Sequence, residues 1–181
     1  MNRFKERKIV ESLAYLAERL ELTDIKAYKL LWLSDRLHLG RYARTITGDQ
    51  YYALEHGPIP SYVKKIVNGR VKSEDFISLF NVSGKSLLLV STPHRYDYLS
   101  DSDKQVLDEV IAAYGSEDEE ELSRVSHLSP EWKRQEPKLR AGEKKSYKMN
   151  LDDFFEDFPD PKKKFLRNGE PEIAKSVFYC D

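Results

Sequence analysis

The rest of the chain is organised around residues Lys26–Ser61, which read KAYKLLWLSDRLHLGRYARTITGDQYYALEHGPIPS. This segment begins as a helix that runs to about Leu39, and its middle, Leu30–Leu33, is apolar on nearly every side. A helix that is apolar all round is normally buried. We therefore expect residues 26–39 to form the central helix of the fold.

Three polar residues stand out on this expected helix, namely Lys29, Asp35 and His38. Asp35 and His38 are three positions apart and therefore share a face. Buried charge is costly unless it is paired, so the pattern predicts a polar cluster with defined partners. Two roles stay open for Asp35: it anchors a buried ion pair, or it contacts a partner from the surface.

The residues after the helix carry strong turn signals. Gly40 is the expected helix stop, and Arg44–Leu54 looks extended on both sides of a Gly48-Asp49 turn, which permits a short hairpin. Asp49 is expected to act as a turn residue that caps its own backbone. Gly57–Pro60 then predicts a rigid bend into a helix over Ser61–Val67, because Pro suits a first helical turn.

Four residues of this segment have side chains that bind divalent metals in other proteins: Asp35, His38, Asp49 and His56. No HExxH or similar spacing accompanies them, so structural hydrogen bonding is the favoured interpretation. His56, followed by Gly57-Pro58, is either a contact site or a histidine that fixes a loop.

The outer elements follow from periodicity and turn residues. Ser100 and Asp103 have the spacing of a capping box, with Asp in place of Glu. We expect helices over Lys5–Leu20, from Ser100 to Gly115 and from Glu117 to Ser126, and a hairpin over Phe76–Val82 and Ser86–Thr92. The predicted fold is α+β and mainly α, with helices around the buried central helix and one small antiparallel sheet.

Composition narrows the class of protein. The chain has 181 residues, 30 Lys plus Arg and 31 Asp plus Glu, and a formal charge of −1, so no global charge draws it to nucleic acid or membrane. Its single cysteine, Cys180, excludes an intramolecular disulfide and a Cys-rich zinc site. No signal-peptide core and no apolar run of membrane-spanning length is present. The expected location is the cytoplasm.

Catalytic motifs are missing from the sequence. There is no Gly-x-Ser-x-Gly elbow and no phosphate-cradling glycine loop, and Cys180 has no positioned partner. We therefore expect a binding protein without enzymatic activity, cofactor or metal.

The composition changes after Pro130. Residues 131–148 contain seven basic and three acidic residues, and a second basic run follows at Lys162–Lys164. These runs could touch nucleic acid, but the acidic segments beside them favour a solvated surface. Asn150–Phe158 is acidic and aromatic and predicts a short helix. Its phenylalanines either anchor a partner or dock on the helical body, and docking is the favoured alternative.

The run from Lys26 to Ser61, with its K-L-L-W-L-S-D helix, G-R, T-G-D turn and H-G-P-I-P, resembles the Panacea domain, also called the SocA-like antitoxin domain. A weaker echo lies at Leu122–Trp132, where Ser126-His127 and Pro130-Glu131-Trp132 follow an acidic helix. The resemblance implies a structural or partner-binding role for Lys29, Asp35, His38, Gly40, Arg41, Thr47, Gly48, Asp49, Tyr52, His56, Gly57, Pro58, Pro60, His127 and Trp132.

The resemblance also implies a function. Panacea-like proteins are antitoxins of bacterial and phage-associated toxin–antitoxin systems, and they neutralise a protein toxin by direct binding. The SocA-like branch implies a second possibility, an adaptor that delivers a bound protein to a protease, and a regulator that binds the nucleic acid of its own operon is a third. We expect a shared domain over residues 1–132 and a charged extension over 133–181 that packs on it. Since the pattern stops at Lys133, the extension is expected to select the partner.

Overall fold

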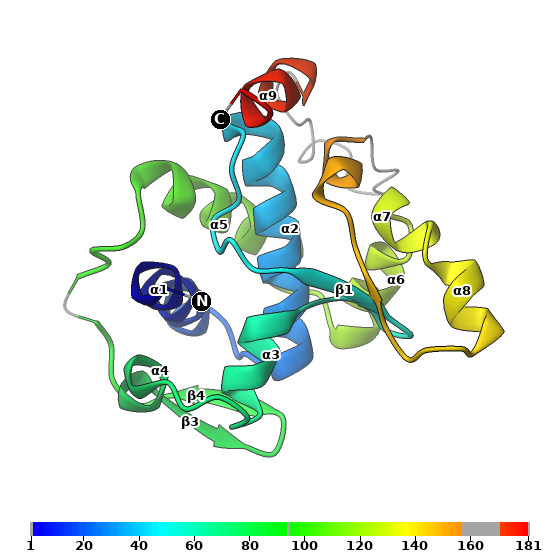
Figure 1. The fold of residues 1–181 in the computed structure, drawn as a ribbon. Coiled ribbons are helices and arrows are strands. Elements are labelled where there is room, and N and C mark those ends of the chain that lie inside the picture. Colours follow the sequence, from blue (N-terminus) through cyan, green and yellow to red (C-terminus); the bar gives the residue numbers. More distant parts are fainter. Residues whose placement is uncertain (1, 94, 157–170, 181) are drawn as a thin grey trace.

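The structure, a computed structural model, describes residues 2–93, 95–156 and 171–180. Helix α2 (Asp24–Tyr42) runs through the middle of the molecule (Figure 1). Leu30–Leu33 on this helix are fully buried. The prediction of a buried central helix is therefore confirmed.

The two ends of α2 differ in how well the sequence indicated them. Thr23 Oγ1 accepts the Lys26 amide at 3.2 Å and caps the start of the helix. The expected stop at Gly40 is wrong, because the helix continues to Tyr42. Ala43 then adopts the left-handed conformation, with φ of 55°, and its amide donates to the Leu39 carbonyl at 3.0 Å.

Helices surround α2, and several of them begin at a residue whose side chain caps the first turn. Asn2 caps α1 by accepting the Lys5 amide, so this helix begins at Arg3, before the expected Lys5. It ends at Ala17, before the expected Leu20. The capping box of Ser100 and Asp103 starts α5, as predicted. The helices are α1 (Arg3–Ala17), α3 (Ser61–Val67), α5 (Asp101–Tyr114), α6 (Glu119–Ser126), α7 (Pro130–Lys133), α8 (Glu136–Ala141) and α9 (Pro171–Phe178).

A three-stranded antiparallel sheet lies against α2 in the order β2-β1-β5. Its strands are β1 (Tyr51–Leu54), β2 (Gly57–Pro60) and β5 (Tyr147–Lys148). The hairpin therefore turns at Glu55-His56 and not at Gly48-Asp49, which corrects the expected register. Residues 44–50 form a loop without a strand because Asp35 takes the Ile46 and Thr47 amides that a strand ladder would need.

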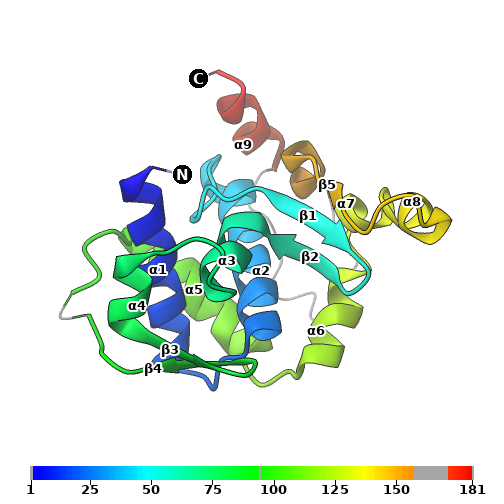
Figure 2. The same cartoon turned by 60° about the horizontal axis from the view of Figure 1, so that its bottom comes forward.

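A second, two-stranded antiparallel sheet pairs β3 (Phe80–Ser83) with β4 (Ser86–Leu89). The expected strand over Phe76–Val82 is wrong in its first half, where α4 (Glu74–Leu79) replaces it. Ser73 explains the difference, since its Oγ accepts the Phe76 amide at 3.2 Å and caps that helix. Figure 2 shows this hairpin at the end of the molecule remote from α9.

The C-terminal segment returns to the helical core. The short 3₁₀ helix η1 (Leu151–Phe155) and α9 both contact α2, and β5 extends the first sheet. Phe154 and Phe155 are buried, so the expected docking on the body is confirmed for these two rings. Phe158 and Lys162–Lys164 lie outside the described residues.

The fold class is α+β and mainly α, as predicted, with two small antiparallel sheets in place of one. Within the described residues, every helix is too short or too polar to cross a lipid bilayer.

Candidate functional site

Asp35 organises the loop that follows α2. Its Oδ1 accepts the Ile46 and Thr47 amides at 2.7 and 2.9 Å, and its Oδ2 accepts the hydroxyls of Thr47 and Tyr51, the latter at 2.8 Å. Burial raises the pKa of this fully buried carboxyl, and the four hydrogen bonds oppose that shift. An ion pair, one of the two roles left open for Asp35, is not found among the described residues, because neutral donors satisfy its carboxylate.

Asp49 performs a role that the turn motif did not indicate. Its carboxylate accepts the Tyr62 amide at 2.9 Å and the Val63 amide at 3.0 Å, in the first turn of α3. This helix starts after Pro60, which offers no side-chain cap. Asp49 thus caps α3 from the loop that precedes β1. The local capping that the sequence predicted is limited to one bond, in which Asp49 accepts the Gln50 amide.

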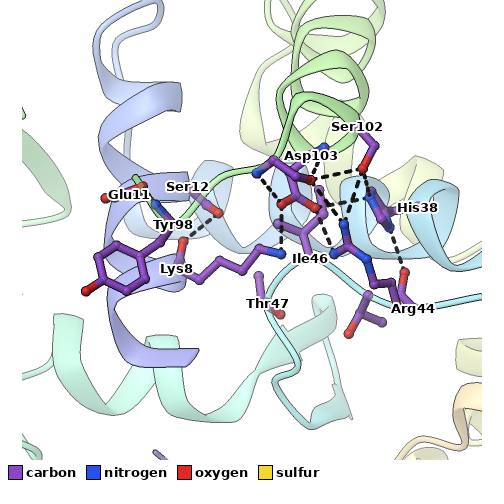
Figure 3. Close-up of polar contacts among 12 residues, drawn as sticks. Lys8, Glu11, Ser12, His38, Arg44, Ile46, Thr47, Tyr98, Ser102 and Asp103 are labelled. Carbon is purple, nitrogen blue, oxygen red and sulfur yellow. Dashed lines mark hydrogen bonds and ion pairs between the residues drawn. The ribbon is translucent and has the colours of Figure 1, made fainter. Parts of the chain in front are cut away.

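A second carboxylate, Asp103, gathers basic side chains from three segments (Figure 3). Lys8 Nζ lies 2.7 Å from its Oδ2, while His38 Nε2 and Arg44 Nη1 lie 3.1 and 3.0 Å from its Oδ1. Burial alone would raise the pKa of Asp103, but the hydrogen bonds from His38, Lys8 and Ser100 outweigh it and hold the pKa well below its usual range.

This Asp103 cluster ties α1, α2 and the loop after α2 to the start of α5. His38 adds a contact between its Nδ1 and the Arg44 carbonyl, 2.7 Å away. Lys8, Arg44 and Asp103 also line a hollow of about 850 Å³, together with Thr47 and Gly48 of the turn. The sequence indicated His38 and the helix cap, but not the ion pairs.

Lys29 is buried beneath the β1–β2 turn. Its ammonium donates to the carbonyl oxygens of His56 and Pro58, the latter at 3.2 Å. Burial lowers the pKa of Lys29 to about 7. Gly57 leaves room for this contact, since a Cβ there would lie 2.5 Å from Lys29 Nζ and 2.1 Å from Ser126 Oγ.

The motif residues of Leu122–Trp132 contact those of Lys26–Ser61 at the same β1–β2 turn. The rings of His127 and Trp132 stack with centroids 3.9 Å apart, and Trp132 Nε1 donates to the Leu54 carbonyl at 2.8 Å. Burial lowers the pKa of His127, and the charge of Lys29 adds to that effect. Residues 78 positions apart along the chain therefore form one site.

A buried ion pair, missed by the sequence interpretation, joins α2 to α7. Arg36 Nη1 lies 2.9 Å from Glu131 Oε2, and Trp32 Nε1 donates to Oε1 of the same carboxylate at 3.0 Å. Burial raises the pKa of Glu131, and the charge of Arg36 opposes that. Arg36 also donates to the carbonyls of Asp153 and Glu156, so it holds η1 as well.

The remaining predicted residues have structural positions. Arg41 forms an ion pair with Glu109 of α5 at 2.8 Å. Tyr52 lies opposite Lys148 in the β1–β5 ladder, and Pro58 and Pro60 belong to β2. Gly40 is buried inside α2. Among the described residues, His, Cys, Asp and Glu side chains form no group of three or more with the geometry of a metal site.

An open groove lies where these motif residues reach the surface. It measures about 770 Å³ and runs between the β1–β2 turn and α8. One wall holds Leu54, Glu55, His56, His127 and Trp132, and the other holds Glu136, Leu139, Arg140, Gly142, Lys144 and Lys145.

A comparison with known protein families matches the part of the chain that carries these motif residues. The family model described as "Antitoxin SocA-like, Panacea domain" matches residues 28–133, which is more than half of the chain. The match includes the fifteen predicted motif residues from Lys29 to Trp132. No curated protein and no solved structure matches the chain significantly.

Proposed function

The chain belongs to the SocA-like antitoxin family with a Panacea domain, and from this we propose that it neutralises a bacterial or phage protein toxin by binding it directly. The observation that carries the proposal is the family match over residues 28–133, which contains all of the motif positions. The proposed activity is stoichiometric binding, and no chemical step is assigned to the chain.

The arrangement of the motif supports binding by a rigid surface. Asp35, Lys29 and Arg36 are fully buried and hold loops and helices in place. His56, one of the exposed motif residues, lines the groove. A pre-organised surface binds a partner at a lower entropic cost than a flexible one, so a buried polar framework suits a binding module.

Growth rescue tests the proposal. The reading frame beside this gene is expressed from an inducible promoter, alone and together with this chain. We expect the neighbour to arrest growth alone and growth to return when this chain is present. A toxic neighbour that this chain fails to counteract would overturn the proposal for that pair.

The fate of the toxin separates direct neutralisation from delivery to a protease. If the toxin is held by binding, its abundance and half-life stay unchanged during rescue, and it purifies with this chain. A toxin that disappears during rescue, and returns when the host protease is deleted, would contradict stoichiometric neutralisation.

A further inference from the structure

The two walls of the groove differ in their relation to the family match. The wall that contains His56, His127 and Trp132 lies within residues 28–133, whereas the wall from Glu136 to Lys145 lies beyond it. Figures 1 and 2 show α7 and α8 on the side of the molecule toward which the β1–β2 hairpin extends. The groove is thus built half from the shared domain and half from the extension.

The apolar part of the groove lining is held in place by contacts with the rest of the protein. Trp132 is only 7% exposed, stacks on His127 and is tied to β1 by its bond to Leu54. Leu139, on the opposite wall, packs partly against the core. An apolar side chain of a partner would therefore meet a preformed surface between Trp132 and Leu139, and buried anchors of this kind dominate interface energy.

The rim of the groove carries more positive than negative charge. Arg140, Lys144 and Lys145 are exposed, and the acids of the lining are Glu55 and Glu136. Glu136 forms an ion pair with Arg140, whose Nη2 lies 2.5 Å from Glu136 Oε1. Neither Lys144 nor Lys145 takes part in an ion pair with another described residue. The surplus favours an acidic partner, since complementary charge sets specificity and association rate.

We propose that the groove receives a segment of the toxin that carries an apolar side chain flanked by acidic residues. The apolar side chain packs between Trp132 and Leu139, and the acids face Lys144 and Lys145. The wall from Glu136 to Lys145 determines which partner is accepted. The identity of the partner as a toxin rests on the proposed function, and the chemistry of the groove does not.

Charge reversal on the rim tests the groove against the toxin found by growth rescue. The variant Lys144→Glu/Lys145→Glu is compared with Arg70→Glu/Lys72→Glu, which reverses two exposed charges between α3 and α4, outside the groove lining. We expect about tenfold or more weaker binding for the rim variant and about twofold or less for the control, because rim charges govern association and its salt dependence. Circular dichroism and thermal unfolding confirm that both variants fold.

The apolar part of the site has its own variant. Leu139→Ser removes the side chain opposite Trp132, and we expect it to weaken binding to the toxin without abolishing folding. If the native chain rescues growth and both groove variants bind and rescue as well as the native chain does, the groove is not the docking site. If the native chain itself fails to rescue growth, the proposed function has failed for that pair, and the peptide titration described next tests the groove on its own.

A peptide probe tests the groove without any toxin. The native chain is titrated with a short peptide of alternating glutamate and leucine, and with its counterpart that has lysine in place of glutamate. Trp32 is fully buried, so a change in tryptophan fluorescence reports Trp132. We expect saturable binding of the acidic peptide only, lost in Lys144→Glu/Lys145→Glu. Equal binding of both peptides would overturn the proposal. Binding of a random DNA duplex without binding of the acidic peptide would overturn it as well.

Discussion

The side chain of Asp35 is held by four neutral donors in a fully buried position. Asp35→Asn keeps the shape but replaces one acceptor oxygen by an NH₂ group that faces hydroxyl and amide donors. Because a buried group is then left without its partner, we expect the free energy of unfolding to fall by about 1–3 kcal/mol. Urea denaturation measures it. Equal stability of the variant and the native chain would show that the carboxylate is not the organiser of the loop.

The Asp35→Asn variant also distinguishes a structural role of Asp35 from direct contact with the partner. Since Asp35 has no exposed surface, the folded fraction of Asp35→Asn should bind the toxin as tightly as the native chain does. Weaker binding by a fully folded variant would mean that the loop over residues 44–49 itself reaches the partner.

At the residue scale, the sequence indicated which side chains need partners but not who the partners are. A polar residue on a buried apolar helix needs a hydrogen-bond or charge partner. This reasoning was correct for Lys29, Asp35 and His38, each of which has such partners. The same reasoning would have found Arg36, which lies on the same helix. Glu131 and Asp103 come from segments far along the chain, and no local spacing reveals that pairing.

Between elements, Asp103 is the link of α5 to α1 and α2. Asp103→Asn leaves the nearly buried Lys8 ammonium without its counter-charge, so we expect the free energy of unfolding to fall by about 3 kcal/mol or more. Glu109→Gln, which breaks the partly exposed pair with Arg41 on the same two helices, is the matched control and should cost about 0–1 kcal/mol.

The pH dependence of this link follows from the direction in which folding shifts the pKa of Asp103. The pKa of Asp103 is lower in the folded chain than in the unfolded one, so its stabilisation is complete above the unfolded value of about 4 and is lost as the pH falls through the folded value. The stability difference between the native chain and Asp103→Asn should be constant above about pH 5 and shrink below about pH 4. A difference that grows on acidification would contradict the ion-pair assignment.

Gly57 lets the β1–β2 hairpin pack against α6. It has φ of 98°, and a Cβ would lie 2.1 Å from Ser126 Oγ. Gly57→Ala should therefore cost more than about 2 kcal/mol, through backbone strain and overpacking together. Gly84→Ala is the control, since φ is 60° and no atom lies within 4 Å, so only strain applies there. Similar thermal unfolding of the two variants would refute the close approach.

At the element scale, the sequence predicted the helices better than the strands. Helix starts carry local caps, as at Thr23 and Ser100. The register of the β1–β2 hairpin depends on Asp35, which removes Ile46 and Thr47 from any ladder. The helix over Glu74–Leu79 was missed because its start depends on the Ser73 cap, and the residues that follow include the strand formers Phe76 and Ile77.

For the whole molecule, the C-terminal segment completes the core of the shared domain. Phe154 and Phe155 are buried on the body, and Glu156 supplies a carbonyl to Arg36. Removal of residues 134–181 should leave Arg36 and the α2 surface exposed, and we expect loss of cooperative unfolding or a much lower Tm. A truncated chain that unfolds at the native temperature would show that the domain ends at Lys133. This is why point substitutions, and not truncation, test the groove.

The hydrophobic pattern and the turn residues of the chain correctly indicated a mainly helical α+β fold around one buried helix. It did not indicate the groove, because that site forms only when β1, α7 and α8 meet. The wall from Glu136 to Lys145 lies beyond the family match, so only the folded chain shows that it faces the motif residues.

Direct binding is the central claim, and the mass of the complex tests it most directly. The toxin identified by growth rescue is expressed together with this chain, purified through a tag on the toxin alone, and measured by size-exclusion chromatography with light scattering. Neutralisation by binding predicts a stable complex with a fixed ratio of the two chains. Full growth rescue by a chain that elutes apart from an intact toxin would contradict the claim.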